Sequence, residues 1–284
     1  MGLNIAIQKS GRLHTETLAL LKDAGLRVDN SKDQLKAEAK GMDATFYFLR
    51  NSDIPKYLED GVADIAVIGE NTLIEKNVQV DIIEHLGFSK CRLSLAVPKE
   101  NSDLDLPSLK GKKIATSYPF TLKQFLDRNA IDATIHVISG SVEIAPNIGL
   151  ADAICDLVSS GSTLFKNGLV EKEVILESQA VLAANRNLDA TKQGLLDQLL
   201  FRIRSVMAGR NHRYILMNVP NDKIDEVSQI LPVLKSPTVL PLVKEGWSSL
   251  HSVIGETDFW NVINQLKGLG AEGILVVPIE KMVI

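Results

Sequence analysis

Two aspartates and a run of small hydroxyl residues lie close together in the middle of the chain, between Ala151 and Gly168. If this stretch begins as a strand, alternation places Asp152 and Asp156 on the same face. Residues 159–163 read SSGST, a turn whose hydroxyls and backbone N–H groups can donate hydrogen bonds to an anion. Because carboxylates accept hydrogen bonds from hydroxyl groups, the two halves together fit a ribose that carries a phosphate. The alternative is an ordinary strand followed by a Ser/Gly turn and a helix cap.

The stretch resembles the phosphoribosyl-diphosphate (PRPP) loop of the ATP phosphoribosyltransferase family, which acts first in histidine biosynthesis. The segments SGSVE at 139–143 and GLA at 149–151 also match that family. One departure is Ser160, which stands where the family usually has threonine but keeps the hydroxyl. The resemblance implies that the ribose hydroxyls contact Asp152 and Asp156, and that the 5-phosphate contacts Ser159, Ser160, Gly161, Ser162 and Thr163.

Charged side chains follow three expected strands nearer the N-terminus. Lys9 and Arg12 come after a strand at 3–7, Arg50 after one at 44–49, and Glu70 after one at 63–69. In an open α/β sheet the ligand crevice lies at the carboxyl ends of the strands, where these side chains are expected. The segments KSGRL, FLRNSDIP and GVADIAVIGEN resemble the same family, which implies that all four residues contact ATP and diphosphate. The alternatives are a solvated loop around Lys9 and a structural Arg50 paired with Asp53.

Composition excludes several classes of protein. The chain has 284 residues, 45% of them hydrophobic, and a net charge of −4, which gives no electrostatic footprint for nucleic acid. Its two cysteines, Cys91 and Cys155, support neither a disulfide framework nor a thiolate zinc site. The N-terminus does not read as a secretory signal, and no apolar run approaches a membrane span. We therefore expect a cytoplasmic enzyme without a membrane anchor.

Strands alternate with helices over most of the chain, which predicts parallel βα units and an α/β fold. A polar break at 98–103 suggests that the chain leaves a first lobe there, and residues 174–183 return to it. Two lobes joined by two crossing segments form a periplasmic-binding-protein-like catalytic region, which the resemblance also implies. The expected domains are lobe I at 1–95 and 181–207, lobe II with the PRPP loop at 96–180, and a regulatory domain at 208–284.

The last domain is expected to have the ferredoxin-like order βαββαβ. The strands are expected at 214–219, 238–242, 248–254 and 273–279, and the helices at 224–231 and 258–269. This region resembles the regulatory domain of the long form of the family. The resemblance implies that histidine binds between neighbouring domains of a hexamer, and position carries its contacts to Asn218, Leu234, Thr238 and Gly273. The alternative is that these residues only cap and pack the sheet.

The resemblance also implies the reaction: the phosphoribosyl group of PRPP moves to N1 of ATP, diphosphate leaves, and histidine inhibits. Because N1 already carries a lone pair, no side-chain nucleophile is assigned. The expected cofactor is Mg²⁺, held mainly by the substrate diphosphate rather than by protein ligands. The expected partners are ATP, PRPP, histidine and further copies of the chain, from dimer to hexamer, with no separate regulatory subunit. Two alternatives are a two-lobe binding protein without catalysis and a regulatory subunit of another enzyme.

Overall fold

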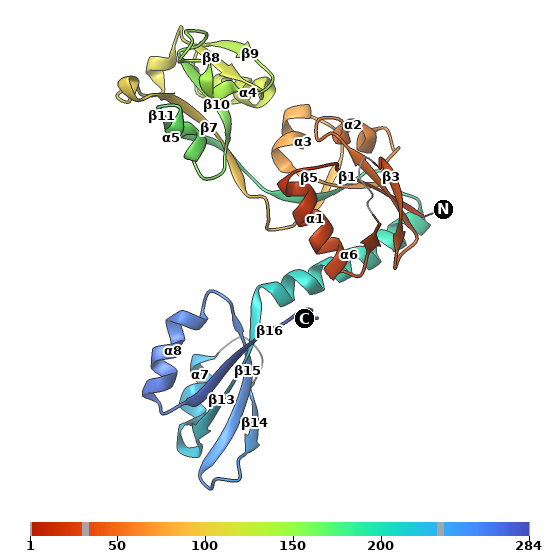
Figure 1. Cartoon of the computed structure of the whole chain (residues 1–284), viewed down its shortest axis with the longest axis vertical. Coiled ribbons are helices and arrows are strands. Elements are labelled where there is room, and N and C mark those ends of the chain that lie inside the picture. The colour runs from red at the N-terminus through yellow and green to blue at the C-terminus, as the bar shows by residue number, and fades with distance from the viewer. Residues whose placement is uncertain (1, 30–33, 232–235, 284) are drawn as a thin grey trace. The chain divides into compact units, whose positions relative to one another are not determined.

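The computed structural model describes residues 2–29, 34–231 and 236–283. The chain divides into two compact units, one of residues 1–19 and 26–196 and the other of residues 20–25 and 197–284 (Figure 1). In these ranges the strands form sheets of seven, five and four strands, and the order of α and β elements confirms the predicted mixed α/β class. No helix in the described part of the chain combines the length and apolar character needed to cross a membrane.

The seven-stranded sheet has the order β2-β3-β4-β1-β5-β12-β6. Its centre is parallel, because β1 pairs in parallel with both β4 and β5, and β12 adds antiparallel to β5. Apolar side chains at the centre of the sheet are buried, and Phe46 of β4 and Ile68 of β5 are both at 0% exposure. The strands are β1 Leu3–Gln8, β2 Arg27–Val28, β3 Lys36–Lys40, β4 Ala44–Leu49, β5 Ile65–Gly69, β6 Asp81–His85 and β12 Ala180–Ala184, with helices α1 Arg12–Asp23, α2 Ile54–Glu59 and α3 Glu70–Lys76.

The five-stranded sheet has the order β11-β7-β10-β8-β9 and carries apolar clusters on both faces. Central strand β10 contributes to each, since Ala153 and Cys155 belong to one cluster and Ile154 and Val158 to the other. This confirms the predicted alternation along the strand. The strands are β7 Cys91–Pro98, β8 Lys113–Thr116, β9 Thr134–Val137, β10 Ala153–Val158 and β11 Leu169–Ser178, with helices α4 Pro119–Arg128 and α5 Ser162–Lys166 and 3-10 turns η1 Lys99–Asn101, η2 Pro107–Leu109 and η3 Val142–Ile144.

The chain passes between these two sheets twice, between β6 and β7 and again between β11 and β12, as the two-lobe prediction requires. The first passage lies earlier than expected. The predicted boundary at residue 95 cuts through β7, which pairs with β10 and β11 of the five-stranded sheet. Likewise, the return segment expected at 174–183 is two strands, β11 and β12, in different sheets. An apolar run identifies a buried strand but not the sheet it joins, which depends on hydrogen bonding to distant segments.

The second unit confirms the predicted βαββαβ order. Its sheet is antiparallel, with the order β14-β15-β13-β16. An apolar cluster that includes Met217, Leu250 and Leu266 lies between the sheet and the helices. Helix α6, Ala190–Arg210, precedes this domain, whose elements are β13 His212–Pro220, η4 Asn221–Lys223, α7 Ile224–Ile230, β14 Thr238–Pro241, β15 Trp247–Gly255, α8 Phe259–Gly268 and β16 Glu272–Pro278.

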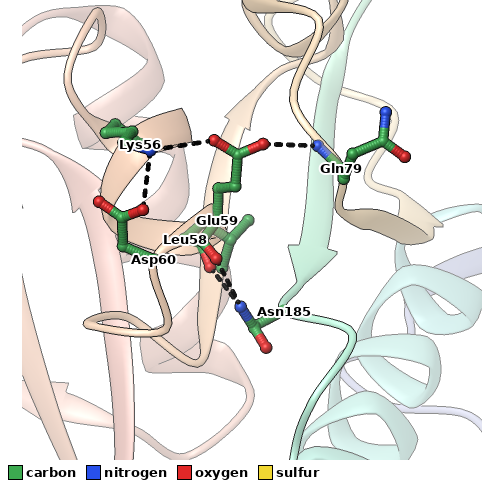
Figure 2. A network of polar contacts seen from close by, with 6 residues as sticks. All are labelled: Lys56, Leu58, Glu59, Asp60, Gln79 and Asn185. Carbon is green, nitrogen blue, oxygen red and sulfur yellow. Dashed lines mark hydrogen bonds and ion pairs between the residues drawn. The ribbon is translucent and has the colours of Figure 1, made fainter.

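Asn185 fastens the end of β12 to the end of helix α2 in the first unit (Figure 2). Its buried amide donates hydrogen bonds to the carbonyl oxygens of Leu58 and Glu59, at 2.7 and 3.2 Å. The Glu59 carboxylate in turn accepts from the Gln79 N–H at 3.1 Å and pairs with Lys56 at 3.3 Å. The last carbonyls of a helix have no partner from a following turn of the helix. The Leu58 carbonyl also accepts from the Gly61 N–H at 3.2 Å, so Asn185 gives Leu58 a second donor and gives the Glu59 carbonyl a buried one.

Replacing Asn185 with alanine should lower the free energy of unfolding by about 1–3 kcal/mol, because two carbonyl groups would lose their buried donor. Urea denaturation followed by circular dichroism measures this loss. Asn187→Ala, two residues away at an exposed position, is the matched control and should change stability by less than about 0.5 kcal/mol. Equal midpoints for the two variants would contradict the role given to Asn185.

Candidate functional site

The carboxyl ends of β1, β4 and β5 carry the charged residues expected near ATP. Gln8 pairs with Leu49 in the parallel register of β1 and β4, and the Lys9 N–H donates to the Leu49 carbonyl at 2.8 Å. Lys9 and Arg50 therefore follow neighbouring strands at the same edge. Glu70 begins α3 directly after β5, and its Oε1 lies 3.4 Å from Nε2 of His85. The structure thus brings Lys9, Arg50 and Glu70 to one end of this sheet.

Arg12 reaches from the first turn of α1 to the five-stranded sheet. Its Nη1 donates to the Ser159 hydroxyl at 3.2 Å, and its Nη2 donates to the Lys90 carbonyl at 3.2 Å. A residue predicted to contact ATP and diphosphate therefore touches the first residue of the predicted PRPP loop. Both belong to the first unit.

A cleft of about 360 Å³ opens at this contact. Glu70 and Ser159 both line it, so two predicted groups of site residues share one cavity. The other lining residues are Lys90, Cys91, Arg92, Glu177, Ser178 and Gln179. Burial raises the pKa of the Cys91 thiol, which keeps it in the neutral form.

The loop at 159–163 presents hydroxyls and backbone to open space. Gly161 has φ of +77°, a conformation that side chains rarely adopt, and a Cβ added there would meet no atom within 4 Å. The Ser160 hydroxyl donates to the Ser162 oxygen at 3.0 Å. An exposed turn with a glycine at positive φ leaves room for a ligand to approach the backbone closely.

Asp156 lies half-buried in β10, three positions before Ser159, where the loop begins. Its Oδ1 accepts from the Leu157 N–H at 2.8 Å, and the strand register places it opposite Ser94 of β7. Burial raises the pKa of the Asp156 carboxyl, and the charge of Glu143 adds to that effect against the hydrogen bond from Leu157. Asp156 is therefore a desolvated acceptor close to the loop.

Asp152 lies at the opposite end of β10. Its Oδ2 accepts from the Lys113 N–H at 2.8 Å, and its Oδ1 lies 3.5 Å from the Lys112 ammonium, both before or at the start of β8. Asp152 and Asp156 are four residue steps apart along the strand, which corresponds to about 13 Å. Alternation placed the two carboxylates on one face, but the structure does not bring them together.

Sequence patterns missed a second arginine at the cleft. Arg92 of β7 lines the cavity and pairs through Nε and Nη2 with both carboxylate oxygens of Glu171, at 2.5 Å each. Ser94 donates to the same carboxylate at 2.6 Å. In the sequence, Arg92 stands out only as a charged residue inside the apolar run CRLSLAVP. A single charged residue in a strand is not a pattern that assigns a role.

The residues expected to bind histidine lie in the second unit. Asn218 of β13 and Gly273 of β16 are neighbours, since a Cβ on Gly273 would lie 3.4 Å from the Asn218 amide nitrogen. Thr238 lies on β14 at the other edge of the sheet, paired with His251. Leu234 falls outside the described residues. Within one chain the structure therefore brings two of the four together.

Comparison with known proteins identifies the family. A family model described as "ATP phosphoribosyltransferase" matches residues 50–205, and one described as "HisG, C-terminal domain" matches residues 209–281. The chain is 52% identical over 285 residues to an ATP phosphoribosyltransferase of Phocaeicola vulgatus, covering 99% of this chain and 100% of the relative. It is 53% identical over 281 residues to an ATP phosphoribosyltransferase of Cytophaga hutchinsonii, covering 99% of this chain and 98% of the relative.

One solved structure adds a fold-level match. It is the ATP phosphoribosyl transferase (HisG:HisZ) complex from Thermotoga maritima, with a TM-score of 0.61 and 30% identity, covering 71% of this chain and 98% of that one. Together the matches confirm the enzymatic interpretation over that of a two-lobe binding protein without catalysis. The chain belongs to the ATP phosphoribosyltransferase family, a family of pentosyl transferases, and its two matched regions are those of the long form.

Proposed function

We propose that the cleft between the two sheets of the first unit binds PRPP and ATP side by side and joins C1 of the ribose to N1 of adenine. The observation that supports this most is the Arg12 to Ser159 contact, because it brings the two predicted half-sites to one cavity. The C1 to diphosphate bond breaks as the C1 to N1 bond forms, and diphosphate leaves. The adenine amino group then gives up a proton to restore neutrality of the base.

The PRPP end of the site is built from the loop and Asp156. Hydroxyls and N–H groups of Ser159, Ser160, Gly161, Ser162 and Thr163 donate to the 5-phosphate. Asp156 accepts hydrogen bonds from the ribose hydroxyls. In this proposal Asp152 has a structural role instead of a PRPP contact, because its carboxylate accepts from the Lys113 N–H and pairs with Lys112 at the start of β8.

The other end of the site receives ATP and the leaving diphosphate. Lys9, Arg12 and Arg50 supply positive charge near phosphate oxygens. The chemical step develops oxocarbenium character at C1 and negative charge on diphosphate, so positioning and charge stabilisation lower the barrier more than a strong base does. Glu70 closes the same edge and lines the cleft.

We propose Mg²⁺ as the cofactor. Across residues 2–29, 34–231 and 236–283, no three or more His, Cys, Asp or Glu side chains form a group that could hold a metal ion. Glu70 and Glu177 do line the cleft, and two carboxylates fit an ion that keeps several waters and takes its remaining ligands from phosphates. When bound, Mg²⁺ neutralises charge on the diphosphate.

Asp156→Asn tests the ribose assignment with two measurements that should move in opposite directions. PRPP binding should weaken by about 1.5–3 kcal/mol, because a charge-assisted hydrogen bond is lost. The raised pKa means that the buried carboxylate costs stability, and this cost appears as pH rises through the range from 3.8 to the folded-state pKa. The amide variant should therefore melt at a higher temperature at pH 7 and show no advantage below pH 3.8.

Diphosphate release from ATP and PRPP gives KM for each substrate, and calorimetry gives the melting temperature. Wild-type affinity for PRPP in Asp156→Asn would place the ribose elsewhere. A fall in melting temperature at neutral pH would contradict the desolvation account.

Gly161→Ala tests the phosphate loop against a matched control, Gly168→Ala. Both glycines have positive φ, +77° and +69°, and both face open space, so both variants carry similar backbone strain of about 1 kcal/mol. Only the methyl group at Gly161 would stand where the phosphate approaches. We expect at least about a tenfold higher KM for PRPP in Gly161→Ala, near 1.4 kcal/mol, and little change in Gly168→Ala. Equal effects in the two variants would remove the loop from the PRPP site.

We further propose that residues 208–284 sense histidine in a homo-oligomer. The sheet face away from α7 and α8 exposes Leu240 at 50%, Leu275 at 57% and Val277 at 44%. Strand pairing places these apolar side chains on one face with Tyr214, because Leu275 is opposite Leu216 and Val277 opposite Tyr214. Exposed apolar side chains on both edge strands of this face support an interface with another copy.

The polar residues of this face support a ligand at that interface. Tyr214 and Ser249 contact opposite ring nitrogens of His251, at 2.8 and 2.9 Å, which fixes the ring beside Thr238. Thr238 can donate to a carboxylate, and Gly273 leaves room beside Asn218. Since Thr238 lies at one edge and Gly273 at the other, two neighbouring domains can together complete the site.

Thr238→Ala should raise the histidine concentration for half-inhibition by at least about tenfold, because one hydrogen bond to a charged group is worth about 1.5–3 kcal/mol. Thr257→Ala, an exposed threonine in the same domain, is the control and should leave inhibition unchanged. Inhibition of diphosphate release gives the value, and sedimentation on the same samples shows whether oligomer size shifts with it. Unchanged inhibition in Thr238→Ala would remove this residue from the sensor.

A further inference from the structure

Two guanidinium groups meet Ser159 from different directions. Arg12 donates to its hydroxyl at 3.2 Å, and Arg92 Nη1 approaches its carbonyl oxygen at 3.4 Å. Strand β10 ends at Val158, and Ser159 is the first residue of the loop. Both its side chain and its backbone are therefore held from outside the loop.

The two arginines differ in how much of their charge is available. Arg12 lies 3.7 Å from Glu16 through Nε, and its side chain is 55% exposed. Arg92 is 32% exposed and forms a bidentate pair with Glu171. The pair lowers the pKa of the Glu171 carboxyl and raises that of Arg92, so both groups stay ionised. A guanidinium neutralised in this way is poorly suited to bind a phosphate directly.

The strand register explains how this pair reaches the loop. Arg92 is opposite Val158 of β10 on one side and Glu177 of β11 on the other, and Ser94 is opposite Asp156. Two irregularities in β11 lie between Glu171 and Leu176, and the Glu171 carboxylate contacts both Arg92 and Ser94. The pair thus lies beside the last residues of β10, next to Asp156.

We propose that Arg92, oriented by Glu171 and Ser94, is a positioning residue that holds the backbone of Ser159 so that the loop is shaped for the phosphate of PRPP. The role rests on the proposed PRPP site. It adds to that site three residues, Arg92, Glu171 and Ser94, that raise the affinity for PRPP without contacting it. They contact the loop or each other instead. If the loop is correctly shaped only part of the time, the apparent dissociation constant rises in proportion.

The positioning role and direct phosphate binding by Arg92 predict opposite effects of Glu171→Gln on the affinity for PRPP. If Arg92 bound phosphate itself, Glu171→Gln would free its charge and strengthen PRPP binding. If Arg92 positions Ser159, Glu171→Gln releases the guanidinium from its fixed orientation and weakens binding. Arg92→Lys also loses the forked geometry that contacts Glu171 and Ser159 together.

The experiment measures dissociation constants of PRPP and ATP for the full chain carrying Arg92→Lys, Glu171→Gln or both. We expect about tenfold weaker PRPP binding in each single variant, ATP binding within twofold of wild type, and a double variant no weaker than either single one. The matched control is Arg186→Lys, whose guanidinium also bridges two side chains, Asp81 at 2.9 Å and Gln79 at 2.9 Å, away from the cleft. It should leave both constants unchanged.

Unchanged or stronger PRPP binding in Glu171→Gln overturns the proposal, as does a loss in Arg92→Lys that adds to that of Glu171→Gln. Loss of ATP binding instead of PRPP binding overturns it too. Asp156→Asn measured alongside separates the two levels. If that variant weakens PRPP while the Arg92 and Glu171 variants do not, the positioning role fails and the PRPP site stands; if none of them weakens PRPP, both fail.

Discussion

The register of β10 between β7 and β8 is the constraint on which the site depends. Ala153, Ile154 and Cys155 are completely buried, so a slip of one residue would exchange the contents of the two apolar clusters. That fixed register puts Asp156 opposite Ser94 and lets the loop start beside Arg92. At the other end, Asp152 accepts from the Lys113 N–H and adds a side-chain bond to the β8 pairing. An exposed turn of small residues is thus attached to a buried strand.

Local patterns predicted most of the fold and part of the site. The apolar runs, the hydroxyl-rich loop and the βαββαβ order are properties of consecutive residues, and the structure has them. Alternation predicted the strand face on which Asp152 lies, but it did not show that Asp152 and Asp156 lie at opposite ends of β10. Four residue steps along a strand span more than the width of a ribose, so the two carboxylates cannot both contact its hydroxyls. Arg92 and Glu171 lie 79 residues apart, so only the antiparallel pairing of β7 and β11 brings them together. The family resemblance supplied the residues proposed to bind PRPP and ATP, and its motifs did not include ion pairs between distant strands such as Arg92 with Glu171.

Asp156 shows how the site conflicts with the stability of the strand that carries it. A carboxylate in a half-buried strand loses hydration, and Glu143 repels it, so its pKa is raised. The hydrogen bond from the Leu157 N–H compensates for only part of the lost hydration. A ribose would supply hydroxyl donors to the same oxygens, so bound substrate would remove part of the cost. The desolvation of Asp156 therefore favours a ligand that brings hydrogen-bond donors to this carboxylate.

The regulatory proposal depends on apolar surface that the second unit leaves exposed to water. A four-stranded sheet with helices on one face leaves Leu240, Leu275 and Val277 exposed on the other, and covering them with a second copy buries apolar surface. A ligand whose contacts come from two copies binds only the assembled state, so it stabilises that state by RT ln(1 + [L]/Kd). A hundredfold excess over Kd contributes about 2.7 kcal/mol, which is enough to change the dominant oligomer. Coupling between binding free energies is reciprocal, so a histidine site that weakens substrate binding in the assembled state would itself be weakened by substrate to the same degree.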